Sequence, residues 1–120
     1  MSLTSSMEDY LKAILVLHQR HGNARCVDVA DYLGVSKPSV SRAVKELSKS
    51  GHIIKKDGTL YLTQQGRQYA EQICERYQFF TARLVDAGVD RKTAEHDACN
   101  IEHAISAEAF QKLKNFLTNK

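Results

Sequence analysis

Apolar side chains recur at steps of three and four residues through most of the chain, which predicts a mostly helical protein. The first such stretch has capping-box spacing over Ser5 to Glu8 and reaches a helix-stopping glycine at Gly22. The side chains that share its apolar stripe are Met7, Leu11, Ile14 and His18. We therefore expect a first helix over 5–21 that packs this stripe against the core.

Two further helices are predicted in quick succession. The second runs over 27–33 and ends at Gly34, and the third is capped by Ser36 with Pro38 in its first turn. The two helices are expected to cross closely at Ala30, where only a small side chain fits. The side chains expected to pack against this crossing from the third helix and the turn before it are Val35, Val40, Val44 and Leu47.

A hairpin is predicted after the third helix, which stops at Gly51. Asp57 and Gly58 lie between short alternating runs at 52–56 and 59–62, and Asp-Gly in that position favours a tight two-residue turn. Helix, helix, turn, helix and hairpin is the order of a winged helix-turn-helix domain.

The second half of the chain is predicted to be three helices. A long helix over 66–87 ends at Gly88, a fifth starts at the cap Asp90, and a sixth starts at Ser106. Their apolar stripes are Tyr69, Ile73, Tyr77, Phe80 and Leu84, then Ala94, Ala98, Ile101 and Ile105, then Ala109, Phe110, Leu113 and Leu117. This half has too few residues for an independent core, so we expect it to pair with a second copy.

The expected fold class is therefore mostly α, a winged helix-turn-helix domain over 1–65 followed by a helical dimerisation domain over 66–120. No apolar run approaches the roughly 20 residues of a membrane span, and the first residues lack a signal-peptide pattern. We expect a cytoplasmic protein with no membrane partner. The three cysteines form no C-x-x-C pair, and Cys26 and Cys74 are expected to be small buried apolar side chains.

Positive charge is concentrated around the third helix and the hairpin. Six basic residues and one acidic residue lie between Ser36 and Lys56, whereas basic and acidic residues are equal in number from Gly66 onward. Such a local excess of positive charge is typical of a surface that binds the phosphate backbone of DNA. The alternative is a helical hairpin whose charged face is only solvated.

The third helix is the predicted DNA-reading element. Arg42 can form two hydrogen bonds with guanine, while Lys37 and Lys45 suit phosphates. The predicted DNA-binding residues are Ser36, Lys37, Pro38, Ser39, Ser41, Arg42 and Lys45.

The spacing of Cys99, Glu102 and His103 is the most informative chemical feature of the second half. On a helix these positions share one face, so a thiolate, a carboxylate and an imidazole can bind one transition-metal ion. The alternative is a small core cysteine, a solvated glutamate and a buried hydrogen-bonded histidine. Beside a DNA-reading helix, the metal interpretation predicts a metal-sensing transcription factor.

The whole chain resembles the diphtheria-toxin-repressor family of metal-dependent regulators, and most of all its short, two-domain manganese-regulator branch. The residues that carry the resemblance are Ser6-Met-Glu-Asp-Tyr-Leu11, the helix-turn-helix segment, and His96-Asp-Ala-Cys-Asn-Ile-Glu-His-Ala-Ile-Ser106. The resemblance implies a homodimer that binds a divalent metal between its first and fifth helices and then binds an inverted-repeat operator of double-stranded DNA. The usual targets of the family are metal-uptake genes, which it represses.

The resemblance implies metal ligation by Asp9, Cys99, Glu102 and His103. Cys99 matches the iron-type pattern and Asp9 the manganese type, so Fe(II) or Mn(II) is the expected ion. Other ligand positions of the family depart from its pattern, and these are Lys12, Tyr77 and Thr81. One metal per subunit is therefore expected.

Two other functions compete with this interpretation. A thiol-based redox regulator would use a low-pKa thiolate at Cys99, with Glu102 incidental. A metal-dependent hydrolase is disfavoured because the chain has neither H-E-x-x-H nor G-x-S-x-G, and we expect no small-molecule substrate and no catalysis. His96, one turn before Cys99, is expected at the surface or behind the ligands.

Overall fold

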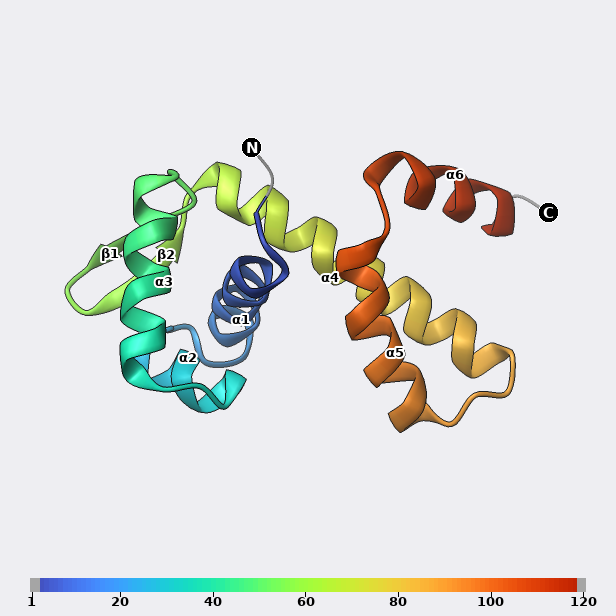
Figure 1. Cartoon of the computed structure of the whole chain (residues 1–120), viewed down its shortest axis with the longest axis horizontal. Coiled ribbons are helices and arrows are strands. Elements are labelled where there is room, and N and C mark those ends of the chain that lie inside the picture. The colour runs from blue at the N-terminus through green and yellow to red at the C-terminus, as the bar shows by residue number, and fades with distance from the viewer. Residues whose placement is uncertain (1–2, 119–120) are drawn as a thin grey trace. The chain divides into compact units, whose positions relative to one another are not determined.

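The computed structural model describes residues 3–118 and divides the chain into two compact units, Met1–Glu71 and Gln72–Lys120. The elements are α1 (Ser5–His21), α2 (Cys26–Leu33), α3 (Lys37–Lys49), β1 (Ile53–Lys56), β2 (Thr59–Leu62), α4 (Gln64–Asp86), α5 (Arg91–Ala104) and α6 (Ala107–Thr118). Figure 1 shows their order along the chain. The mostly helical, winged helix-turn-helix fold is confirmed. No helix among the described residues is long and apolar enough to cross a membrane.

Helix α1 is the centre of the first unit, and it contacts α2, α3 and β2. Leu11, Ile14 and Leu15 on α1 are at most 2% exposed. Each fully buried side chain of this size stabilises the fold by roughly 1.5–3 kcal/mol. The side chains that meet them in the core include Val29, Val40, Leu47, Ile53 and Leu60. This core lies directly behind α3, so the first unit holds its third helix on a rigid base.

The predicted turns and caps of the first unit are present, with one shift. Asp57 and Gly58 have φ values of 52° and 78°, the two left-handed residues of a tight hairpin turn that pairs Lys56 with Thr59. Thr4, rather than Ser5, caps α1 by accepting a hydrogen bond from the backbone N–H of Met7 at 3.2 Å. The prediction that the cap lay at Ser5 was wrong by one residue, because Thr and Ser at adjacent positions have equivalent hydroxyls.

Some side chains expected in the core are more exposed than their stripe predicted. Val35 is 38% exposed, because its backbone N–H bonds to the carbonyl of Ala30 and closes the turn after α2, outside the helical stripe. Ala109 is exposed because α6 buries one side chain fully, Phe110. Cys26 and Cys74 are half-buried, not fully buried, so neither is a core residue.

The hairpin meets the start of α4 at a buried histidine. His52 is 5% exposed, its Nδ1 lies 2.6 Å from the hydroxyl of Ser50, and the ring of Tyr69 meets it edge-on. Burial lowers the pKa of His52 below its usual range, so the imidazole is neutral at pH 7. A Cβ at Gly66 would lie 1.9 Å from the carbonyl oxygen of His52. Glycine is therefore required there, inside a helix that begins two residues earlier than the sequence predicted.

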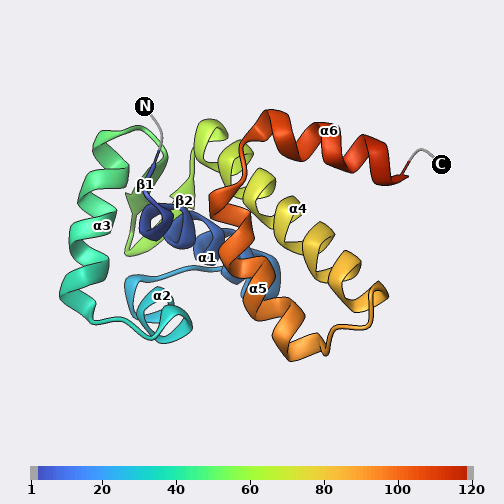
Figure 2. The same cartoon turned by 45° about the vertical axis from the view of Figure 1, so that its right-hand side comes forward.

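The second unit is a three-helix layer with a thin core. Both Figure 1 and Figure 2 show α5 lying beside the second part of α4, with α6 following after a short turn. Phe110 of α6 meets Phe79 edge-on at 5.5 Å and lies 6.0 Å from Phe80, and Lys114 pairs with Glu75. Phe116 is 75% exposed, which leaves one side of α6 uncovered.

The close approach at Gly66 predicts a stability effect with an unusual sign. Ala for Gly inside a helix ordinarily stabilises by about 0.5–1 kcal/mol. At Gly66 the added methyl group displaces α4 from His52, so we expect a loss of about 1–3 kcal/mol in the free energy of unfolding. Urea denaturation measures it. Gln68→Ala, at an exposed position two residues along the same helix, is the control and should be neutral. Equal stability of Gly66→Ala and the wild type would contradict the packing described here.

Candidate DNA-binding and metal-binding sites

The predicted DNA-binding residues lie together at the start of α3. Six of the seven are exposed and Ser39 is half-buried. Ser36 caps the helix by accepting a hydrogen bond from the backbone N–H of Ser39 at 3.2 Å. The helix dipole at this first turn favours an anion such as a DNA phosphate.

A short chain of hydroxyl groups supports Arg42. The hydroxyls of Ser36 and Ser39 are 2.8 Å apart, and Nη2 of Arg42 donates to Ser39 Oγ at 3.4 Å. Arg42 also borders an open groove of about 340 Å³ between the start of α1 and α3. Ser39 therefore orients the guanidinium of Arg42, which leaves the other nitrogens of that guanidinium for DNA.

The hairpin carries two exposed lysines that the residue list from sequence did not include. Lys55 and Lys56 lie in β1, and Lys56 is next to the turn. The hairpin is fastened to α1 because Nε2 of His18 lies 2.6 Å from the carbonyl oxygen of Leu60 and its ring stacks on Tyr61. Both lysines belong to the local excess of basic residues between Ser36 and Lys56, and that excess could have identified them.

The candidate ligands of the second unit lie on α5, which starts where Asp90 accepts a hydrogen bond from the backbone N–H of Thr93. The buried face of this helix consists of Ala94, Ala98 and Glu102. Glu102 is 0% exposed, whereas Cys99 and His103 are half-buried. Glu102 therefore lies on the apolar stripe, not beside it, and it is not a solvated surface charge. A carboxylate without solvent must be paired, protonated or bound to a metal.

Asp9, the remaining candidate ligand, belongs to α1 in the first unit and is half-buried. Its neighbour Glu8 is 8% exposed, and it is an acidic residue that sequence reasoning considered only as part of a helix cap. The periodicity of α1 could have found it, since Glu8 is three residues before Leu11 on the apolar stripe.

The candidate metal site has suitable donor groups, but they are not grouped closely enough to bind an ion. Within residues 3–118 no three His, Cys, Asp or Glu side chains come close enough together to hold a metal ion. The donor set itself fits one, because a thiolate, a carboxylate and an imidazole are all good ligands for divalent transition metals. Cys99, Glu102 and His103 lie within two turns of α5, at spacings that put them on one side of the helix.

Three ligand positions of the family carry other residue types in this chain. Lys12 and Tyr77 are half-buried, and Thr81 is 6% exposed. His96 is exposed on α5 and lies 3.5 Å from Asp97, away from the buried face of the helix. One metal per subunit stays a prediction.

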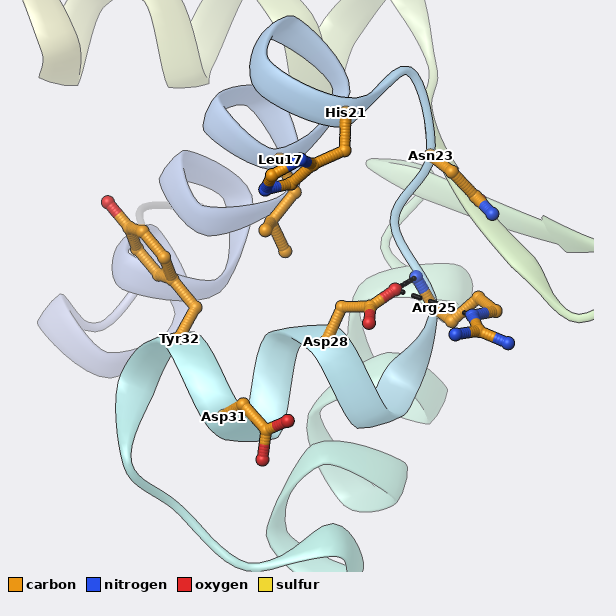
Figure 3. Close-up of a pocket in the computed structure, with 7 residues that line it drawn as sticks. All are labelled: Leu17, His21, Asn23, Arg25, Asp28, Asp31 and Tyr32. Atoms are coloured by element: carbon orange, nitrogen blue, oxygen red, sulfur yellow. Dashed lines mark hydrogen bonds and ion pairs between the residues drawn. The ribbon is translucent and has the colours of Figure 1, made fainter.

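A separate open groove of about 550 Å³ lies between the end of α1 and α2. Figure 3 shows Asp28 directed at Arg25, whose backbone N–H donates to Asp28 Oδ2 at 3.0 Å. This backbone hydrogen bond holds the pKa of Asp28 below its usual value. Arg25 and Asp28 thus pair with each other at the start of α2. The other residues that line it are Leu17, His21, Asn23, Asp31 and Tyr32.

Comparison with known proteins agrees with this geometry. The family described as "Iron dependent repressor, N-terminal DNA binding domain" matches residues 2–58. The family described as "Iron dependent repressor, metal binding and dimerisation domain" matches residues 63–120. The two matches together cover nearly the whole chain, and they assign DNA binding to its first half and metal binding with dimerisation to its second.

Related proteins support the same assignment. The HTH-type transcriptional regulator MntR of Listeria welshimeri is 36% identical over 113 residues, which are 93% of this chain and 80% of that protein. The MntR of Listeria monocytogenes is 36% identical over 111 residues, 92% of this chain and 78% of that protein.

Two solved structures are similar over the full chain. The manganese regulator SloR is 26% identical with a TM-score of 0.82, and IdeR of T. acidophilum is 26% identical with a TM-score of 0.74. This chain covers 56% and 57% of their respective lengths. The two matched families favour metal-dependent regulation over the thiol-based redox alternative at Cys99. The chain therefore belongs to the iron-dependent repressor family, the diphtheria-toxin-repressor and manganese-regulator group of metal-dependent, DNA-binding transcriptional regulators.

Proposed function

We propose that this chain is a metal-activated repressor of metal-uptake genes, which acts as a homodimer on an inverted-repeat operator. Residues 1–65 are the proposed DNA-binding domain and residues 66–120 the metal-binding and dimerisation domain. The observation that carries the proposal is Glu102, a fully buried carboxylate between a half-buried thiol and a half-buried imidazole on α5. The activity is binding rather than catalysis.

The proposed ligands of a single divalent ion are Asp9, Cys99, Glu102 and His103. A bound ion would supply positive charge for the Glu102 carboxylate, which burial otherwise destabilises. Cys99 and His103 must both be deprotonated to bind, so metal affinity falls as the pH is lowered. Fe(II) or Mn(II) is the proposed ion. The matching family is named for its dependence on iron, and the structurally similar SloR is a manganese regulator.

A second copy of the chain is the proposed partner of the second unit. The core of this unit is thin, and Phe116 and Val85 are 75% and 38% exposed. Burying such side chains against a second copy would add roughly 25 cal/mol for each Å² of apolar surface removed from water. Pairing also places two recognition helices on one operator, and an isologous dimer matches an inverted repeat in symmetry.

The proposed roles in α3 predict different consequences for two basic residues. Arg42→Ala should weaken operator binding by about 1–3 kcal/mol and relax base preference, because it removes a direct contact with a base. Lys45→Ala should weaken operator and scrambled duplexes about equally, since phosphates carry no sequence information. Fluorescence anisotropy on both duplexes measures this. Unchanged affinity and preference in Arg42→Ala would show that α3 is not the reading helix.

The proposed ligands predict loss of metal response without loss of the fold. His103→Ala and Glu102→Gln should each abolish metal-stimulated operator binding and leave the weak, non-specific DNA affinity intact. The measurement is operator binding with and without Mn(II) or Fe(II) under anaerobic conditions, after circular dichroism has shown that each variant is folded. His96→Ala is the matched control, because His96 is exposed on the same helix and should keep the full response. A normal metal response in both ligand variants would rule out this site.

Cys99 is expected to set the choice of metal. A thiolate favours Fe(II) over Mn(II), whereas a carboxylate tolerates Mn(II), so Cys99→Glu should shift the operator-binding response toward Mn(II). Titrating both proteins with each ion under anaerobic conditions measures the shift. Cys74→Ala, which changes a half-buried cysteine on α4, should leave the preference unchanged. If wild type and Cys99→Glu respond alike to both ions, Cys99 is not a selecting ligand.

A further inference from the structure

The last turn of α5 carries two of the proposed ligands and ends without a side-chain cap of its own. The helix ends at Ala104, and Ile105 is extended with φ −98° and ψ 138°. The last carbonyl groups of a helix have no partner within it, and the turn that they belong to frays unless something binds them. Glu102 and His103 both lie in this turn.

Arg76 of α4 binds two of these terminal carbonyl groups. Its Nη1 donates to the carbonyl oxygen of Glu102 at 3.2 Å and to that of Ile105 at 3.1 Å. The two carbonyls lie on either side of the point where the helix ends, so one nitrogen joins the ligand-bearing turn to the segment that leads into α6. A cation at the C-terminus of a helix is also favoured by the helix dipole.

The guanidinium of Arg76 is itself fixed by packing. Arg76 is half-buried, its Cζ lies 5.9 Å from the ring centre of Phe110, and Phe110 packs edge-on against Phe79. Its Nε is buried without a hydrogen-bond partner among the described residues. Against that cost, Nη1 makes two charge-assisted hydrogen bonds, one to Glu102 in α5 and one to Ile105 just after it. Charge-assisted hydrogen bonds are stronger than bonds between neutral groups.

We propose that Arg76 is a positioning residue for the metal site, fixing the backbone of the last turn of α5, which carries Glu102 and His103, before a divalent ion arrives. The inference rests on the proposed function, because it requires those two residues to be ligands. Arg76 contacts no metal. It acts through the backbone that carries the ligands, and ligands held in place bind an ion with less loss of conformational freedom.

The same helix supplies a matched control. Arg83 is also half-buried on α4, lies over an aromatic ring with its Cζ 5.6 Å from the centre of Phe79, and has a buried Nε without a partner in the described part of the chain. Its hydrogen bond goes to Asp86, within α4. Arg83 therefore shares the packing of Arg76 and lacks its link to α5.

The test measures the affinity of the full-length protein for Co(II) and Mn(II) alone, by titration without DNA. Arg76→Met keeps the aliphatic stem and removes the donors, so its metal affinity should fall about 10–100-fold, the range found when groups that orient ligands are removed. Arg76→Lys retains a charged donor and should recover part of the loss. Arg83→Met should match the wild type. At saturating Co(II) the ligand-field spectrum of Arg76→Met should equal that of the wild type, because the ligands are unchanged, whereas Glu102→Gln should alter it.

Three results would overturn the inference. Wild-type affinity in Arg76→Met would show that the link to α5 does not orient the ligands. Equal losses in Arg76→Met and Arg83→Met would show a general effect of packing on α4. A wild-type protein that binds neither ion would remove the proposed function and this inference with it, and that outcome is visible before any variant is made.

Discussion

Burial of one carboxylate constrains the second half of this protein. Glu102 has no exposed surface, and it lies on the face of α5 where every other buried residue is alanine. Ala94 and Ala98 precede it on the same face of the helix, at steps of four residues. An ionised group in such a place costs several kcal/mol unless a partner offsets it. Metal ligation is one way to offset such a cost, and it fits the neighbouring thiol and imidazole.

In the first half of the chain, the packing supports α3, the proposed DNA-recognition helix. The buried face of α1 supports α3 from behind, and the hairpin is fastened to α1 through His18 and to α4 through His52. At the front, Ser36 caps α3 while Ser39 orients Arg42. The arginine proposed to read the operator is thus placed by the helix cap and not by a flexible loop. Exposed lysines on α3 and β1 surround it with the charge that DNA binding requires.

Local signals in the sequence predicted the architecture well, because caps, helix-ending glycines and the Asp57-Gly58 turn are determined by a few adjacent residues. Errors arose where several residues could serve equally, as at Thr4 and Ser5, or where a stripe was extended through a turn, as at Val35. The burial of Glu102 was missed because periodicity ranks residue types by hydropathy, which places a glutamate beside an apolar stripe rather than on it. The hydrogen bonds from Arg76 to Glu102 and Ile105 join residues 26 and 29 positions apart, and no local pattern encodes them. Asp9 and the α5 residues were grouped through family resemblance rather than through spacing, and their joint role as ligands stays a prediction.

The central claim is that metal binding and operator binding are coupled in one chain. Coupling between two sites is reciprocal, so an ion that tightens operator binding must itself be bound more tightly when the operator is present, by the same factor. The direct measurement is the Mn(II) or Fe(II) dissociation constant of the wild-type protein, anaerobically, with and without a saturating operator duplex. The account predicts tighter metal binding with the operator, by a factor equal to the increase in operator affinity that saturating metal produces. Metal affinity that does not change when operator is added would contradict the account.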